Sequence, residues 1–435
     1  MSEASAAPVA PTTSHPFTAA VVALGKIGLP LAVQIAAAGH TVVGADIDQR
    51  AVDLINAGKA PFPGEAGLEE ALTELVAAGR LRATTSTAEA VAQAEFVVAV
   101  PPLMVDENAE IDWTILDTVI SDIGPHLQAG TRFSLETTVP VGTTRERIAP
   151  RLEELSGLEL GVELNVAFSP ERVFSGRIFA DLATYPKLVG GVTLACERKV
   201  AQDYRSFLVA DVRELGSAEA AELTKLVETT YRDVNIALAN EFARYADRVG
   251  IDLGPVIDAA NSQPFSHVHT PGVAVGGHCI PVYPRFYLQG DPQAQVVATA
   301  RAGNETMPVH TVDLLARDLE LGGKRVLVLG AAYRGGVRET AFSGVFPLVE
   351  ELSRRGAFPQ VVDPLYDQAA LTALALPSWD GEPVDGAIIQ ADHDEYRALR
   401  PEQVPGAGTV VDGRGTLDAT NLGNAGIRVR RIGGG

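Results

Sequence analysis

A cysteine that follows two glycines is the first feature of this sequence that could do chemistry. Cys279 comes after Gly276, Gly277 and His278 and shortly before a proline. Glycines remove side-chain bulk, so a ligand can lie against such a loop, and a thiolate there would act as a nucleophile. The other cysteine, Cys196, is expected to be a small buried core residue. We therefore assign chemistry to Cys279 alone.

A second candidate site is a glycine turn near the N-terminus. The segment 23–28 is a G-x-G-x-x-G fingerprint whose first glycine is replaced by alanine. Gly25 would let the backbone approach a pyrophosphate, and Gly28 would let the following helix pack closely. Asp46, at the end of the next apolar run, would bind the ribose hydroxyls and repel a 2′-phosphate. This pattern indicates NAD binding, and nearby Arg50 leaves NADP open.

Histidines near the cysteine offer a third reading, a metal site. His267 and His269 have a spacing typical of ligands on a strand, and His278 follows. No acidic residue or second cysteine lies close to them in sequence, so the ligand set is incomplete. We predict that the protein has no metal site.

The elements that must position these residues begin with a repeated strand–helix alternation. Apolar runs bounded by glycine predict buried parallel strands, and apolar residues at helical spacing separate them. The strands are expected at 17–24, 41–45, 96–100, 131–136, 164–168 and 187–190, and the helices at 25–39, 50–57, 68–78, 87–92, 114–125 and 143–152.

The middle of the chain has a different pattern. Segment 217–249 contains neither proline nor glycine and predicts one long helix, followed by a shorter helix at 255–261. Glu222, Lys225 and Glu228 would ordinarily form a solvated face of ion pairs on it. A long helix between two α/β blocks suggests a link between domains and a dimer surface.

The alternation restarts near Lys324, with strands at 325–329, 360–362, 386–390 and 409–411 and a helix at 344–355. The fold class is therefore α/β, with two Rossmann-like doubly wound domains joined by a long central helix. We expect a disordered tail (1–16), an NAD-binding domain (17–203), a central helical domain (204–308) and a C-terminal domain (309–435).

Composition limits the partners. The 435 residues carry 55 acidic and 35 basic side chains, a formal net charge of −20, which disfavours nucleic acid and anionic membranes. No apolar run reaches the ~18 residues that span a bilayer. With two cysteines and no signal peptide at the N-terminus, we expect a cytoplasmic protein.

Taken in order, the motifs resemble those of the UDP-glucose/GDP-mannose dehydrogenase family, the nucleotide-sugar 6-dehydrogenases. The similarity runs from about Phe17 to Arg430, and any one motif alone would be weak. The matching stretches are Leu24–Pro30, Glu136–Pro140, Ser169–Val173, Leu223–Glu228, Gly276–Ile280, Leu329–Arg334 and Asp412–Arg414.

The resemblance implies a mechanism. NAD would oxidise the sugar C6 alcohol to an aldehyde, and Cys279 would capture it as a thiohemiacetal. A second oxidation would give a thioester, which water hydrolyses to the uronate. Lys225 would stabilise the oxyanion, Glu171 would act on the water, Thr138 would position it, and Thr229 would donate a hydrogen bond.

The resemblance also implies the binding residues and partners. The cofactor would contact Gly25, Lys26, Ile27, Gly28, Asp46, Arg50, Pro101 and Thr138. The UDP-sugar would contact Glu171, Arg172, Val173, Lys225, Gly276, His278, Tyr333, Arg334 and Arg414. A homodimer or higher homo-oligomer is expected.

The Gly276–Ile280 stretch and the Asp233–Asn235 run resemble the branch that acts on UDP-N-acetylhexosamines, above all UDP-N-acetylmannosamine. UDP-glucose, UDP-N-acetylglucosamine and GDP-mannose stay open as substrates. Thr229 replaces a family asparagine and Tyr283 a family aspartate, which also leaves open a catalytically silent nucleotide-sugar binder.

Overall fold

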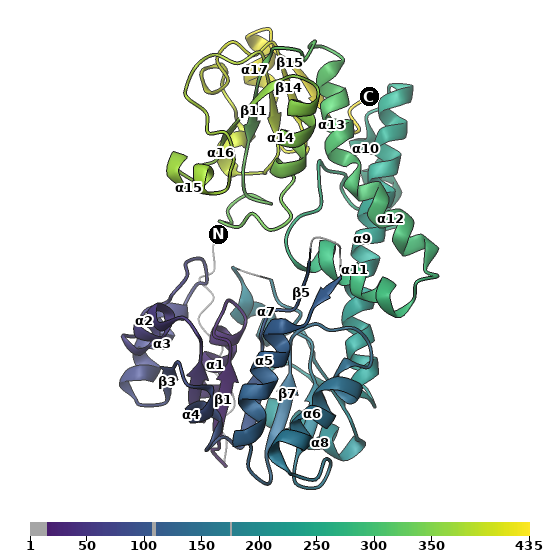
Figure 1. Cartoon of the computed structure of the whole chain (residues 1–435). Coiled ribbons are helices and arrows are strands. Elements are labelled where there is room, and N and C mark those ends of the chain that lie inside the picture. Colours follow the sequence, from purple (N-terminus) through teal and green to yellow (C-terminus); the bar gives the residue numbers. More distant parts are fainter. Residues whose placement is uncertain (1–14, 107–109, 175) are drawn as a thin grey trace. The chain divides into compact units, whose positions relative to one another are not determined.

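The computed structural model describes residues 15–106, 110–174 and 176–435, so most of the predicted tail (1–16) lies outside the described residues. The chain divides into two compact units, 1–227 and 228–435, which are described separately (Figure 1). Within the described residues, no helix combines the length and apolar character that crossing a membrane requires.

The first unit contains an eight-stranded sheet in the order β10-β9-β8-β7-β4-β1-β2-β3. All neighbouring strands are parallel except β8 and β9, which are antiparallel. The strands are β1 (Thr18–Val22), β2 (Thr41–Ala45), β3 (Leu81–Thr84), β4 (Phe96–Ala99), β7 (Arg132–Leu135), β8 (Asn165–Phe168), β9 (Lys187–Gly191) and β10 (Val212–Glu214). A small antiparallel ribbon pairs β5 (Met104–Val105) with β6 (Ile111–Asp112).

The strand order explains where a ligand can bind in this unit. β1 lies between β2 and β4, so the chain turns to opposite sides of β1, and sheets of this kind bind ligands beyond the carboxyl ends of the strands at such a point. Strands β1 and β4 are almost wholly buried because apolar residues run through them without alternation. Gly25, Pro101 and Thr138 therefore follow strands at the same edge of the sheet.

Helices flank this sheet (Figure 1). Their apolar faces join one core that includes Ile35, Phe96 and Tyr204. The helices are α1 (Gly28–Ala37), α2 (Gln49–Asn56), α3 (Leu68–Ala77), α4 (Thr87–Val91), α5 (Thr114–Ile123), α6 (Ala149–Ser156), α7 (Ile178–Thr184) and α8 (Leu194–Phe207), with a 3₁₀ turn η1 (Gly124–His126) and a π turn η2 (Thr144–Ile148).

The long helix α9 (Ala218–Val249) matches its expected limits closely, and the division between the units falls within it. The expected solvated face is wrong at two positions, because Glu222 is fully buried and Lys225 is 8% exposed. Both side chains form hydrogen bonds with loops of the first unit instead of facing water.

Four shorter helices follow in the second unit: α10 (Leu253–Asn261), α11 (Cys279–Gly290), α12 (Gln295–Glu305) and α13 (Met307–Ala316). Sequence analysis placed Cys279 within a loop, and the structure corrects this, since the loop ends at His278 and Cys279 is the first residue of α11. Pro281 and Pro284 hid the helix. A proline in the first turn is well tolerated, and Pro284, inside the helix, is buried.

The second sheet has five parallel strands in the order β12-β11-β13-β14-β15. They are β11 (Arg325–Leu329), β12 (Phe358–Val362), β13 (Gly386–Ile389), β14 (Thr409–Asp412) and β15 (Arg428–Arg431), with helices α14 (Val345–Arg354), α15 (Gln368–Ala373), α16 (Asp394–Arg397), α17 (Thr420–Asn424) and a 3₁₀ turn η3 (Pro401–Gln403). One core joins this sheet to Ala243 and Ala246 of α9. The expected α/β class with two doubly wound sheets is confirmed.

Candidate active site

The glycine turn after β1 is built to leave backbone accessible. Ala23, which replaces the first glycine, has φ +75°, the left-handed conformation that glycine adopts most easily. A Cβ on Gly28 would lie 2.0 Å from the carbonyl oxygen of Ala23, so only glycine allows helix α1 to begin there. A Cβ on Gly25 would meet nothing within 4 Å. The turn is therefore closed on its helix side and open at Gly25.

Asp46 fixes this turn. Its Oδ2 accepts the Leu24 N–H at 2.8 Å, and its Oδ1 accepts the Asp48 N–H at 3.0 Å. The side chain is half-buried, and each carboxylate oxygen can accept more than one hydrogen bond. The open turn, the start of helix α1 and this carboxylate form the arrangement that a dinucleotide pyrophosphate and ribose require. The residues present therefore fit NAD.

The other expected cofactor contacts lie around the same edge. Lys26 and Ile27 belong to the turn, and Arg50 lies on the exposed first turn of α2. The buried Pro101 follows β4, and its carbonyl oxygen accepts a hydrogen bond from Thr137, beside Thr138. The structure thus brings these residues to the carboxyl edge of a single sheet.

Glu171 is held in place from several directions. Its Oε1 accepts the N–H groups of Arg172 at 2.6 Å and Val173 at 3.1 Å, and its Oε2 lies 3.0 Å from Lys187 Nζ. Lys225 Nζ donates to the Glu171 carbonyl oxygen at 2.6 Å. The structure therefore joins two expected catalytic residues directly.

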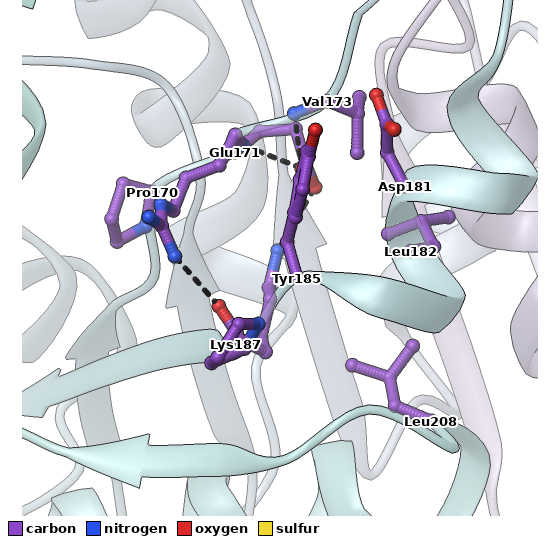
Figure 2. A pocket seen from close by; sticks show the side chains of 10 residues that line it. Pro170, Glu171, Val173, Asp181, Leu182, Tyr185, Lys187 and Leu208 are labelled. Carbon is purple, nitrogen blue, oxygen red and sulfur yellow. Dashed lines mark hydrogen bonds and ion pairs between the residues drawn. The ribbon is translucent and has the colours of Figure 1, made fainter. Parts of the chain in front are cut away.

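The Glu171 segment and helix α7 line a small cavity (Figure 2). Tyr185 and Lys187 lie on its wall, and the Arg172 guanidinium donates to the Pro186 carbonyl oxygen at 3.1 Å. The cavity has a volume of about 10 Å³, which is room for roughly one water molecule.

Glu222 anchors the loop that carries Thr138. Its two carboxylate oxygens accept the N–H groups of Gly142 at 2.6 Å and Thr144 at 2.8 Å. Burial raises the pKa of Glu222 to about 7. Because Glu222 lies one helical turn before Lys225 on α9, the lysine and the Thr138 loop share one rigid support.

In the second unit, the exposed Cys279 opens helix α11. Its thiol therefore stands at a helix N-terminus, at the end of the loop that contains Gly276 and Gly277. Cys196 is fully buried in α8, as expected for a core residue.

The two glycines before Cys279 have a different immediate role from the expected one. A Cβ on Gly276 would lie 2.6 Å from Tyr333 Cβ, and one on Gly277 would lie 3.0 Å from Tyr333 Cε2. Gly277 has φ +82°, and its N–H donates to the Ala341 carbonyl oxygen. The glycines therefore let the cysteine loop pack against the ring of Tyr333.

Polar contacts reinforce this packing. His278 Nε2 lies 2.6 Å from Glu339 Oε1, and Arg334 Nε donates to the Tyr333 hydroxyl at 3.0 Å.

Arg414 donates to the carbonyl oxygens of Gln390, Tyr333 at 2.9 Å and Ala274 at 3.3 Å. The expected substrate-binding arginine thus holds together the loops around the cysteine segment.

Helix α9 contacts the segment that leads into the cysteine loop. Thr229 is buried one turn after Lys225. Asn235 accepts the His269 N–H at 3.0 Å, and Asn240 accepts the Gly272 N–H at 2.9 Å. His269 thus takes part in this loop through its main-chain N–H, and the part of the chain that the structure describes holds no group of three metal-binding side chains.

Sequence reasoning missed Glu136, Lys187 and Glu222 as residues of the site. Lys187 Nζ lies 2.9 Å from Glu136 Oε2, and all three side chains are almost fully buried. A carboxylate at the carboxyl end of β7 was an available signal for Glu136, because ligand sites gather at that edge. Nothing in the local sequence distinguishes Lys187 from an edge lysine.

Comparison with known proteins agrees with this geometry. Three family models match in order, all of the UDP-glucose/GDP-mannose dehydrogenase family: the NAD binding domain (residues 17–208), the central domain (219–306) and the UDP binding domain (327–419).

Individual relatives cover almost the whole chain. A UDP-N-acetyl-D-mannosamine dehydrogenase from Pyrococcus horikoshii is 34% identical over 93% of this chain and 97% of its own. An NDP-N-acetyl-D-galactosaminuronic acid dehydrogenase from Ralstonia solanacearum is 31% identical over 93% and 97%. The solved structure of the UDP-D-ManNAc dehydrogenase from Pyrococcus horikoshii has a TM-score of 0.87, with 31% identity over 96% of this chain and 99% of that one. The chain therefore belongs to the UDP-glucose/GDP-mannose dehydrogenase family, the NAD-dependent nucleotide-sugar dehydrogenases.

Proposed function

We propose that this protein oxidises the C6 alcohol of a UDP-N-acetylhexosamine to the uronate, with UDP-N-acetylmannosamine as the favoured substrate. The observation that carries the proposal is Cys279, an exposed thiol on the first residue of helix α11, directly after a loop that contains two glycines. The chemistry needs a nucleophile that captures the aldehyde before the second oxidation.

NAD supplies the hydride acceptor for both oxidations. In the first, the hydroxyl group at C6 loses its proton and the C6 carbon loses a hydride, which leaves an aldehyde. The Cys279 thiolate adds to this carbonyl carbon and forms a thiohemiacetal. The thiohemiacetal then loses its hydroxyl proton and a second hydride from C6 to give a thioester. Attack of water on the thioester releases the uronate and two protons and restores the thiolate. Two NADH form for each sugar, and no oxidant besides NAD is needed.

The side chains divide these steps between them. The Lys225 ammonium would stabilise the oxyanion of each tetrahedral species, with Thr229 as a second donor. Glu171 would take the proton from the attacking water, which Thr138 would help to position. Asp46, Gly25 and Gly28 would hold the cofactor, with Lys26, Ile27, Arg50 and Pro101 around it.

On the substrate side, Tyr333 and Arg334 would contact the UDP-sugar together with Arg172, Val173, Gly276 and His278. Arg414 would act mainly by holding the cysteine loop, because its guanidinium already donates to three backbone carbonyls. The names of the relatives support an N-acetylated sugar, and they differ in which hexosamine they specify. The need for a free thiolate favours a reducing compartment, in keeping with the predicted cytoplasmic location.

The deciding experiment is a panel of nucleotide sugars with NADH counted per sugar consumed. UDP-N-acetylmannosamine, UDP-N-acetylglucosamine, UDP-glucose and GDP-mannose are offered to the wild type and to Cys279→Ser. We expect two NADH per UDP-N-acetylhexosamine from the wild type and no multiple turnover from the variant. Calorimetric binding of UDP-sugars with no NADH from any of them would instead support a silent binder, which the replacements at Thr229 and Tyr283 leave open.

Helix α9 also supports the proposal of a homodimer. Tyr231, Leu238, Phe242, Tyr245 and Val249 are each at least 40% exposed and recur at helical spacing. Sedimentation of the wild type should give a dimer, and Leu238→Glu with Tyr245→Glu should shift it toward the monomer.

A further inference from the structure

Behind Glu171 lies a buried ion-pair cluster that the proposed reaction does not use. Lys187 Nζ lies between Glu171 Oε2 at 3.0 Å and Glu136 Oε2 at 2.9 Å. Glu136 Oε1 accepts a hydrogen bond from the Tyr204 hydroxyl, and the Lys187 ammonium lies 5.1 Å from the centre of the Tyr204 ring. The side chains of Lys187 and Glu136 are 4% and 0% exposed.

The cluster is built by the sheet. Glu136 follows β7, Glu171 follows β8, and Lys187 begins β9, so three consecutive strands of the sheet supply the charges. Because β9 is antiparallel to β8, its first residue lies at the same edge as the ends of β7 and β8. Reversing this one strand is what brings a lysine to the carboxyl edge.

Burying two carboxylates with one ammonium has electrostatic consequences. Desolvation raises the pKa of Glu136 to about 7, against the pull of Lys187. Desolvation also opposes ionisation of Glu171, but Lys187, the Arg172 N–H and Lys225 outweigh it and lower its pKa. The charges of Glu136 and Glu171 raise the pKa of Lys187 despite its burial. The cluster therefore favours the carboxylate form of Glu171 and disfavours that of Glu136.

We propose that Lys187 is a positioning residue for Glu171, and that Glu136 and Tyr204 hold the Lys187 ammonium in the place from which it orients the Glu171 carboxylate. Lys187 fixes Oε2, and the backbone N–H groups fix Oε1, so the carboxylate has one orientation. The inference rests on the proposed function, in which Glu171 activates the water that hydrolyses the thioester.

Positioning of Glu171 gives a step-specific effect. Both hydride transfers precede hydrolysis, so loss of Lys187 should leave the first turnover intact and slow the release of product. General-base catalysis contributes about 10²–10⁴ in rate, and we expect Lys187→Met to lose a part of it, roughly 10- to 100-fold in steady-state kcat. A purely structural role would not separate the two phases.

The experiment compares Lys187→Met, Lys187→Arg and Glu136→Gln with the wild type and with Lys199→Met, a control at an exposed lysine of α8. Stopped-flow NADH formation gives the burst and the steady-state rate, and intact mass spectrometry detects acyl enzyme on Cys279. We expect Lys187→Met to keep a burst of two NADH per site, to accumulate acyl enzyme and to turn over slowly. Lys187→Arg should recover part of the rate, and Lys199→Met should match the wild type.

Glu136→Gln supplies an independent readout through the pH profile. We expect kcat of the wild type to change near pH 7, where the raised pKa of Glu136 lies, and this change to weaken or move in the variant while the burst persists. The same variant decides the question if Lys187→Met fails to fold.

Two results would overturn the inference while leaving the proposed function intact: a wild-type steady-state rate in Lys187→Met, or equal loss of burst and steady state in every folded cluster variant. A wild type that forms no NADH from any UDP-sugar would instead refute the proposed function, and the inference with it.

Discussion

The two sheets of this protein begin with the same turn and use it differently. In the first, the Ala23 N–H donates to the carbonyl oxygen of Ala45 at 2.8 Å, and Asp46 follows Ala45 in sequence. In the second, the Gly330 N–H donates to the carbonyl oxygen of Val362, also at 2.8 Å, and Asp363 follows. Both turns have positive φ, +75° at Ala23 and +109° at Gly330.

The two aspartates have opposite surroundings. Asp46 is half-buried and accepts two backbone N–H groups. Asp363 is 5% exposed, and its Oδ2 accepts the N–H groups of Ala331 and Ala332 as well as a hydrogen bond with His393 Nε2 at 3.1 Å. In the second sheet a histidine therefore contacts the aspartate that corresponds to Asp46.

The segments after the two turns differ as well. Helix α1 begins at Gly28, directly after the first turn, whereas α14 begins only at Val345. The loop between Gly330 and α14 carries Tyr333, which packs on the cysteine loop. The first turn thus leads directly into a helix N-terminus, whereas the second leads into a loop that packs on the segment before Cys279.

The largest effect is expected where the second turn is tightest. A Cβ on Gly330 would lie 2.5 Å from Ala391 Cβ and 2.7 Å from Ala391 N. Overpacking and left-handed strain together should make Gly330→Ala less stable by about 3 kcal/mol in urea unfolding. Gly322→Ala, where a Cβ meets nothing within 4 Å, is the matched control. Equal stability of the two variants would contradict the tight packing.

The second effect concerns the cofactor. Asp46→Ala removes a charged acceptor, and each such hydrogen bond contributes about 1.5–3 kcal/mol, so NAD affinity should fall roughly 10- to 100-fold. Calorimetric titration of NAD measures this. Asp363→Asn is the control and should bind NAD like the wild type; a similar loss in both variants would remove the functional difference between the two aspartates.

The third effect concerns stability and pH. Burial alone would raise the pKa of Asp363, but hydrogen bonds from His393 and the backbone outweigh it and hold the pKa below its usual range. A carboxyl whose pKa is lower in the folded state than in the unfolded state stabilises the protein at a pH above its unfolded-state pKa. This stabilisation is lost as the pH falls through its folded-state pKa. Asp363→Asn should therefore cost about 1.5 kcal/mol at neutral pH and less in acid. Unfolding curves across the acid range would show that the difference in unfolding free energy between the wild type and the variant becomes smaller as pH falls. A difference that grows in acid would contradict the prediction.

The smallest effect is expected at Ala23. Ala23→Gly removes about 1 kcal/mol of left-handed strain but adds chain entropy to the unfolded state, so a net gain of about 0.5 kcal/mol remains. Thermal unfolding with NAD absent measures it. A clear loss of stability would mean that the alanine methyl packs favourably in the turn.

Much of the fold could be predicted from sequence, because it depends on local patterns. Helix α9 was located to within one residue by the absence of proline and glycine. Strand β15 was missed because its arginines at 428, 430 and 431 hide an edge strand. Helix α11 was missed because two prolines interrupt its pattern.

The site was less predictable, because its contacts join distant segments. The resemblance named Glu171 and Lys225, but their contact spans the sheet and helix α9. Lys187 reaches the site only because β9 runs antiparallel to β8. The residues of a strand do not by themselves determine its direction relative to its neighbours. The role of Arg414 likewise depends on carbonyl groups from three separate loops.

The contrast between the two thiols has a practical consequence. Cys196 is sealed in the core and Cys279 is exposed, so a thiol reagent applied to the folded protein should react at one position. On the proposed mechanism, the number of equivalents consumed before activity disappears counts the working molecules in a preparation. Cys279 thus allows the active sites to be titrated with a thiol reagent. Protection of Cys279 from the reagent by a bound nucleotide sugar would report how much of the substrate site is occupied, without any turnover.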